Sequence, residues 1–347
     1  MTVQQRILSS ARRALFFLTI LGPGLITASA DNDAPGIATY SMAGSRFGYT
    51  FLWILVWITF GEVVVQETAS RMGAVTGKGL TDLIRERFGL RLTFLVVLGL
   101  ILANLGTTAA EFAGVASSAE LFGISRYIAV PIAAVAVWLL VTRGSYKHVE
   151  KVLLALSLYA VAYIASAIIV RPPWGEVLRE AVIPTIHLNT NYLLSVLATV
   201  GTTITPWGAV YLQASVADKG VKMKNYINTK LDVIFGSAIG NIVSAFIIIS
   251  TAATLFTRGI VVDTAQQAAL ALAPVAGQRA EVLFGVGLLG ASLLAASVLP
   301  LATTYAVCEV FGWERGLNHR FDEAPVFYGL YTALIVLSSV IVLIPGL

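Results

Sequence analysis

Two short polar runs interrupt apolar segments of the sequence, and the first run carries two carboxylates. The six residues from Asp31 to Gly36 read Asp-Asn-Asp-Ala-Pro-Gly, and proline and glycine both break helices. Carboxylate, amide and carbonyl oxygens are hard ligands of the kind that Mg²⁺, Ca²⁺ and Mn²⁺ prefer. We therefore expect a cation site with Asp33 as a ligand. Asp31 is either a second ligand or a structural carboxylate, and Asn32 lies beside the pathway.

The second interruption spans 201–211, and its proline, Pro206, lies 171 positions after Pro35 of the first. A tyrosine follows each proline by five residues. Unwinding a buried helix frees carbonyl oxygens, and these attract cations. We interpret Pro206 and Gly208 as residues that interrupt the helical backbone at this break.

One further carboxylate, Glu111, lies among small residues in a third apolar segment. It either lines the ion pathway, pairs with an arginine, or is protonated and buried. Two other acidic residues, Glu62 and Glu67, precede Arg71 and are expected to form an interfacial charge cluster. The three histidines, His148, His187 and His319, fall in connectors or at segment ends and are expected to be solvated.

The segments that position these residues are those of a membrane protein. The chain has 347 residues, of which 57% are hydrophobic and 12% charged, with a mean hydropathy of +0.82. Repeated apolar stretches of about 20 residues predict an all-α polytopic fold. A single cysteine, Cys308, excludes an intrachain disulfide and a thiolate metal cluster. We predict nine spans, at 14–43, 50–70, 92–120, 126–142, 151–170, 190–217, 229–256, 281–307 and 325–345.

Lysine and arginine cluster in alternate connectors. All but six of the 23 lie on the side that holds residues 1–13, which predicts a cytoplasmic N-terminus in the cell membrane. The net charge of +4 therefore needs no nucleic acid to explain it. Arg6, Arg12 and Arg13 resemble the start of a signal peptide, but the apolar run continues without a cleavage pattern. Two connectors, 79–88 and 264–276, are predicted to form short helices.

The two broken spans, the first and the sixth, are five spans apart. An odd number of spans between repeats inverts the second copy, so the sequence predicts an inverted repeat with units 1–170 and 171–347. A second unit of five spans needs a tenth helix, and the sequence stops after the ninth predicted span. We therefore expect a truncated chain that lacks that helix.

These residues resemble the NRAMP divalent-metal transporters, and more closely the NRAMP-related magnesium transporters. The similarity extends over nearly the whole chain, including residues 22–24, Asp33, and the stretches 44–49, 66–73 and 75–78. The resemblance implies the LeuT fold, with a divalent metal bound between the unwound first and sixth helices. It also implies that the metal is the substrate and that there is no cofactor.

The resemblance places Gly36 where the family has a ligand asparagine and Thr205 where it has a methionine. It also places a backbone carbonyl ligand at Thr202. Loss of the soft thioether favours hard ions, and fewer direct ligands leave room for the water that Mg²⁺ retains. The implied metal ligands are Asp31, Asp33, Gly36, Glu111, Thr202 and Thr205.

Proton coupling is also expected to differ from that of the proton-coupled members. Glu111 keeps the family glutamate, but Thr108 stands at the family aspartate and Gln213 stands near the family histidine. Neither replacement titrates near neutral pH. We predict transport of Mg²⁺ and also Mn²⁺, uncoupled from protons, by a monomer in the lipid bilayer.

Three alternatives remain open at this point. They are a proton-coupled transition-metal transporter, an amino-acid carrier of the same fold, and an intramembrane enzyme that binds a diphosphate through Mg²⁺. Asp31 and Asp33 would repel the carboxylate of an amino acid. The enzyme would need a second acidic motif and basic phosphate ligands, and only Glu111 is found.

Overall fold

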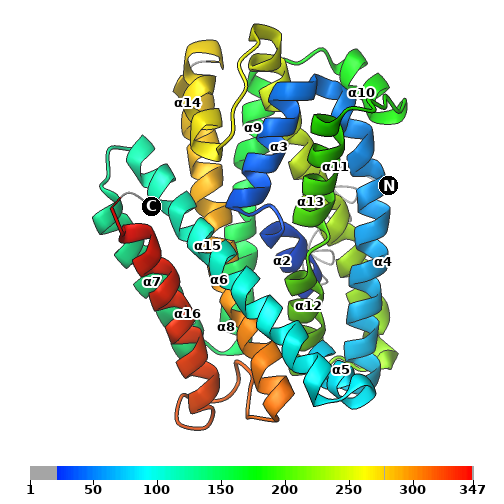
Figure 1. The fold of residues 1–347 in the computed structure, drawn as a ribbon, viewed down its shortest axis with the longest axis vertical. Helices are drawn as coiled ribbons and strands as arrows, with labels where there is room; N and C mark the ends of the chain where they lie inside the picture. Colours follow the sequence, from blue (N-terminus) through cyan, green and yellow to red (C-terminus); the bar gives the residue numbers. More distant parts are fainter. Residues whose placement is uncertain (1–21, 277, 346–347) are drawn as a thin grey trace, which may run out of the picture.

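The computed structural model describes residues 22–276 and 278–345, and all regular structure in these ranges is helical (Figure 1). Residues 14–21 of the first predicted span, together with Arg6, Arg12 and Arg13, lie outside the described residues. The helices are α2 (Pro23–Ala30), α3 (Ala34–Phe47), α4 (Leu52–Thr76), α5 (Leu80–Phe88), α6 (Leu90–Leu121), α7 (Arg126–Arg143), α8 (Tyr146–Leu156), α9 (Ala160–Ile169), α10 (Trp174–Val182), α11 (Thr190–Thr203), α12 (Pro206–Asp218), α13 (Tyr226–Thr254), α14 (Ala265–Ala276), α15 (Gln278–Phe311) and α16 (Pro325–Leu343).

Within the described residues, 8 helical stretches are long and apolar enough to cross a membrane. The stretch Ala34–Thr76 contains the second predicted span and the α3 part of the first, because α3, the 3₁₀ turn η1 (Gly48–Phe51) and α4 follow one another without a gap. The α2 part of the first predicted span precedes this stretch. Each of the other seven predicted spans corresponds to one stretch. The prediction of a polytopic helical membrane protein is therefore confirmed.

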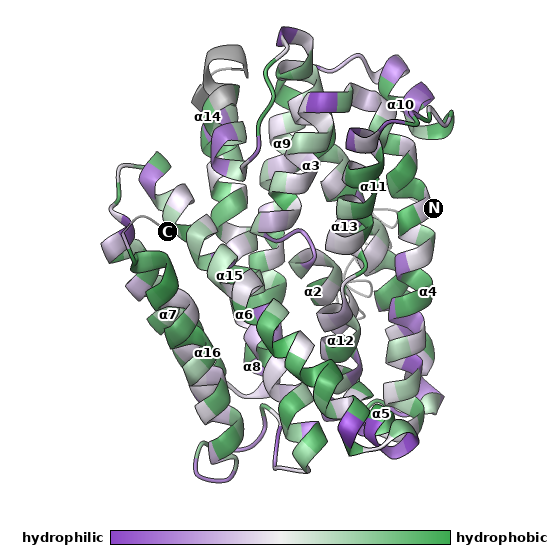
Figure 2. Cartoon of the chain, in the orientation of Figure 1, coloured by the Kyte–Doolittle hydropathy of each residue, from purple (hydrophilic) through white to green (hydrophobic). Residues whose placement is uncertain are grey.

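The helices that carry the two breaks lie in the middle of the molecule (Figure 1). Helices α2 and α12 are central, and α7 and α16 lie together at one side. Apolar residues cover the long outer faces, whereas hydrophilic residues gather at the two ends (Figure 2). That distribution matches a slab of lipid around the middle and water at both ends.

Helix α13 holds α2 in place by close backbone contact. Gly236 and Gly240 are four residues apart on α13, and an added Cβ on either would lie 2.7 Å from a backbone atom of α2. Small residues at this spacing let membrane helices approach closely. Asp232, one turn earlier, accepts hydrogen bonds from the backbone N–H groups of Gly22 (2.8 Å) and Gly24 (2.7 Å). The α13 carboxylate therefore caps the start of α2.

Both predicted connector helices are present, and they mark opposite ends of the molecule. Helix α5 covers the predicted segment 79–88 at one end, and α14 covers 264–276 at the other (Figure 1). Helix α10 was not predicted. It is a single short helix after Pro172 and Pro173 that buries Val177 and packs against α4 and η1.

Candidate metal site

The two breaks have the same local design. Helix α2 ends at Ala30 and α3 begins at Ala34, while α11 ends at Thr203 and α12 begins at Pro206. The residue before each new half-helix caps it with its own side chain. Asp33 Oδ1 accepts a hydrogen bond from Gly36 N at 2.7 Å, and Thr205 Oγ1 accepts one from Gly208 N at 3.2 Å. Each cap satisfies a backbone N–H that would otherwise lack a partner at membrane depth.

Oxygen atoms converge on the bare face of Gly36. A Cβ built at this position would lie 2.9 Å from the Asp31 carbonyl oxygen, 3.0 Å from Asp33 Oδ1 and 3.3 Å from Thr202 Oγ1. One carbonyl, one carboxylate and one hydroxyl therefore surround a point that a side chain would fill. We call these three groups, with Gly36, the oxygen cradle. It joins the two breaks, because Asp31 and Asp33 precede α3 and Thr202 lies in the last turn of α11.

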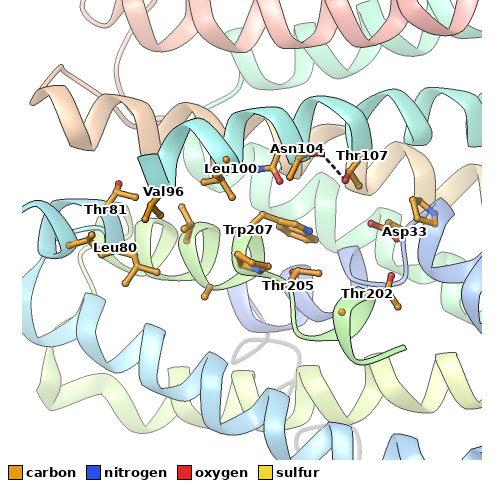
Figure 3. Close-up of a pocket in the computed structure, with 18 residues that line it drawn as sticks. Asp33, Leu80, Thr81, Val96, Leu100, Asn104, Thr107, Thr202, Thr205 and Trp207 are labelled. Atoms are coloured by element: carbon orange, nitrogen blue, oxygen red, sulfur yellow. Dashed lines mark hydrogen bonds between the residues drawn. The ribbon is translucent and has the colours of Figure 1, made fainter. Parts of the chain in front are cut away.

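A cavity of about 640 Å³ opens from this cradle. Asp33, Thr202 and Thr205 line one end of it, and Leu80 and Thr81 of α5 line the other (Figure 3). Between these ends the walls are mainly apolar. The cavity therefore connects the two breaks to the end of the molecule that carries α5.

A second cavity, of about 280 Å³, reaches the same turn from the opposite side. It is lined by Ala34 and Pro35 at the start of α3 and by Asp263 and Thr264 before α14. The first turn of α3 therefore separates two cavities that open toward opposite ends of the fold. A solute that passed from one cavity to the other would have to cross this turn.

Helix α6 contributes Glu111 to the first break. Its Oε2 accepts a hydrogen bond from Ala34 N at 3.1 Å, while Oε1 is buried and accepts no hydrogen bond from the described residues. Thr108, one turn earlier, is also buried, and its hydroxyl has no hydrogen-bond partner there. The structure thus brings Glu111 next to Asp33, although Glu111 does not line the larger cavity.

Asp31 contributes its backbone carbonyl to the cradle, and its carboxylate contacts the second break. Its Oδ1 accepts a hydrogen bond from Thr205 Oγ1 at 2.8 Å. Asn32 turns toward α13, where its Nδ2 donates to Gly240 O at 2.9 Å and its Oδ1 accepts from Ser244 at 2.6 Å. Asn32 therefore ties the break to α13 instead of lining a cavity.

Gln213 lies away from the breaks, near the α5 end. Its Nε2 donates to Lys78 O at 3.0 Å, which links α12 to the turn before α5. All three histidines are exposed, as the sequence predicts. Among the described residues, no group of three or more His, Cys, Asp or Glu side chains gathers to hold a metal. A metal at the cradle would depend on mixed oxygen ligands.

The expectation for Glu62 is wrong. Glu67 does lie near Arg71, at 3.6 Å, as an interfacial pair would. Glu62, however, is only 1% exposed and is hydrogen-bonded to Asn241 of α13. The two glutamates differ because they point to different faces of α4, and Glu62 shares its buried face with Gln66. The spacing of four residues between Glu62 and Gln66 is the signal that could have identified this polar face.

Two discontinuous helices that meet at buried carboxylates between opposed cavities define a secondary transporter of the LeuT-like class. Comparison with known proteins identifies the family to which the chain belongs. The family model described as "Natural resistance-associated macrophage protein-like" (Nramp) matches residues 24–347. The chain belongs to the Nramp family, a family of metal-ion transporters and not of enzymes.

Relatives of known type agree with this assignment. The chain is 30% identical over 293 residues to a divalent metal cation transporter MntH of Yersinia enterocolitica, covering 82% of this chain and 71% of that protein. It is 31% identical over 299 residues to MntH of Erwinia tasmaniensis, covering 83% and 71%. The fold is similar to a crystal structure of the Eremococcus coleocola manganese transporter, with a TM-score of 0.71, 21% identity, and coverage of 93% of this chain and 76% of that one. The predicted family and fold are confirmed.

Proposed function

We propose that this divalent metal cation transporter carries hard ions, Mg²⁺ and also Mn²⁺, and that it does so without obligatory proton transfer. The observation that carries the proposal is the ligand chemistry of the cradle. Asp33, Thr202 and the Asp31 carbonyl offer only oxygen atoms, and Thr205 stands beside them without a sulfur or nitrogen donor. Such a set favours hard ions over softer transition metals.

The space around the cradle supports an ion that keeps part of its water. Gly36 offers no side-chain ligand, and the adjoining cavity of about 640 Å³ is far larger than a bare ion. Mg²⁺ loses its water reluctantly and usually retains several water ligands in proteins. Asp33 and the Thr202 hydroxyl would then bind the ion directly or through that water.

The driving force in this proposal is the membrane potential. Thr108 and Gln213 have side chains that do not titrate near neutral pH. An inward-negative potential favours entry by about 2.3 kcal/mol per charge per 100 mV, hence about 4.6 kcal/mol for a divalent ion. Uptake therefore does not require a proton gradient. We further propose a monomer in the cell membrane, with α5 and the N-terminus on the cytoplasmic side, where most lysines and arginines lie.

Flux measurements with an Asp33 variant test the assignment of the site. Asp33→Ala removes both a ligand and the cap of α3, and we expect at least a tenfold loss of Mg²⁺ and Mn²⁺ uptake into proteoliposomes. Asp322→Ala is the matched control, because its side chain is 71% exposed in a connector. Equal uptake by Asp33→Ala and the wild type would overturn the site, whereas Asp322→Ala should behave as the wild type.

A further inference from the structure

A second group of buried oxygen atoms lies near Gly208 at the start of α12, and none of its residues lines the larger cavity. Four of these atoms accept no hydrogen bond from the described residues: Asp31 Oδ2, Glu62 Oε1, Gln66 Oε1 and Asn241 Oδ1. The four residues are between 1% and 5% exposed, and they come from the first break, α4 and α13. Buried polar atoms normally have partners, so four on neighbouring elements call for an explanation.

Contacts within the structure place these four side chains next to one another. Asn241 Nδ2 donates to Glu62 Oε2 at 2.5 Å, which leaves the amide oxygen of Asn241 free. Gln66 lies one turn after Glu62 on α4, and its Nε2 is 3.1 Å from a Cβ position built on Gly208. Thr205 Oγ1 is 2.8 Å from the same position and donates to Asp31. Gly208 therefore sits between the α4 side chains and the break.

The charge of the cluster favours a cation. Asp31 and Glu62 lie close enough to interact electrostatically, and among the described residues neither forms an ion pair with lysine, arginine or histidine. Two like charges without a counter-ion are costly in a medium of low dielectric constant. A cation would offset both charges and give the free oxygens a partner.

We propose that Asp31, Glu62, Gln66 and Asn241 form a second cation site that takes a hard divalent ion, Mg²⁺ or Mn²⁺. Two carboxylates supply charge to match a divalent ion, and two amide oxygens complete a hard ligand set. Thr205 forms the wall between this site and the cradle. The second site depends on Glu62, the cradle depends on Asp33, and each binds its ion without the other.

Counting bound Mn²⁺ tests the proposal directly. Full-length protein in detergent is titrated with Mn²⁺, and free ion is measured by electron paramagnetic resonance. We expect two ions per chain for the wild type, one for Glu62→Gln and one for Asp33→Ala. Mg²⁺ should displace both ions. Glu67→Gln is the matched control on the same helix and should bind two.

The variants also separate this site from the transport site. Should Glu62→Gln fail to give a monodisperse protein, Gln66→Met removes one ligand at similar volume and should weaken only one of the two ions, by about tenfold or more. Equal numbers of bound ions in the wild type and in Glu62→Gln would overturn the second site. Selective release of the Glu62-dependent ion by NaCl, but not by choline chloride, would make it a sodium site and refute the divalent assignment. If Asp33→Ala binds as many ions as the wild type, the cradle is refuted and the second site stands.

Discussion

Gly36→Ala places a single methyl group at the centre of the oxygen cradle. The added carbon would lie 2.9 Å from the Asp31 carbonyl oxygen and 3.0 Å from Asp33 Oδ1, both closer than ordinary contact. The oxygen atoms must then shift, which changes their positions as ligands of an ion in the adjoining space. Overpacking of this kind costs about 1–3 kcal/mol. Because the displaced oxygens are the proposed ligands, we expect this cost to fall on the ion-bound state, where it corresponds to a loss of about 5- to 150-fold in metal affinity.

The same substitution should leave helix α3 itself intact. Gly36 lies in the first turn of α3, where its backbone is helical, and alanine is a better helix former than glycine. The assay combines Mn²⁺ affinity and uptake with thermal unfolding in detergent. Gly106→Ala on α6 is the control, because nothing lies within 4 Å of its Cβ position. Wild-type affinity in Gly36→Ala, or an equal loss in Gly106→Ala, would refute the cradle.

Two further substitutions test the breaks and their support. Thr205→Met restores a soft thioether and should shift uptake toward Cd²⁺ relative to Mg²⁺, whereas Thr205→Val, which loses the same cap, should not. Unchanged ion preference in Thr205→Met would mean that this side chain does not face the ion. Asp232→Asn removes one of the two carboxylate oxygens that accept backbone N–H groups at the start of α2, and it should destabilise the protein by about 1–3 kcal/mol. Thermal unfolding measures this loss, and an unchanged midpoint would contradict the capping role.

The spans and both breaks could be predicted because they depend on local sequence. Apolar length gives a membrane helix, and proline with glycine gives the break. The directions of Asp31 and Asp33 could not be predicted, because the residues between two half-helices follow no regular period. Glu62 is buried against Asn241, 179 positions away, and the only local sign of this burial is the four-residue spacing to Gln66. Helix α10 is too short and polar to resemble a span.

Other contacts around the site also arise from distant parts of the chain. Glu111 reaches Ala34 across 77 positions, and Asp232 caps α2 across more than 200. The sequence identified Glu111 because a carboxylate in an apolar segment is conspicuous. It did not identify Asp232, which lies close to a lysine-rich connector and resembles an ordinary surface residue there.

The most direct test of the proposed function measures metal and proton movement together. Proteoliposomes with an internal pH dye are held at a fixed inward-negative potential, and a Mg²⁺ or Mn²⁺ gradient is imposed. We predict metal entry that depends on Asp33 and proceeds without a change in internal pH. Metal entry accompanied by stoichiometric acidification, or no entry of Mg²⁺ while Mn²⁺ enters, would contradict it.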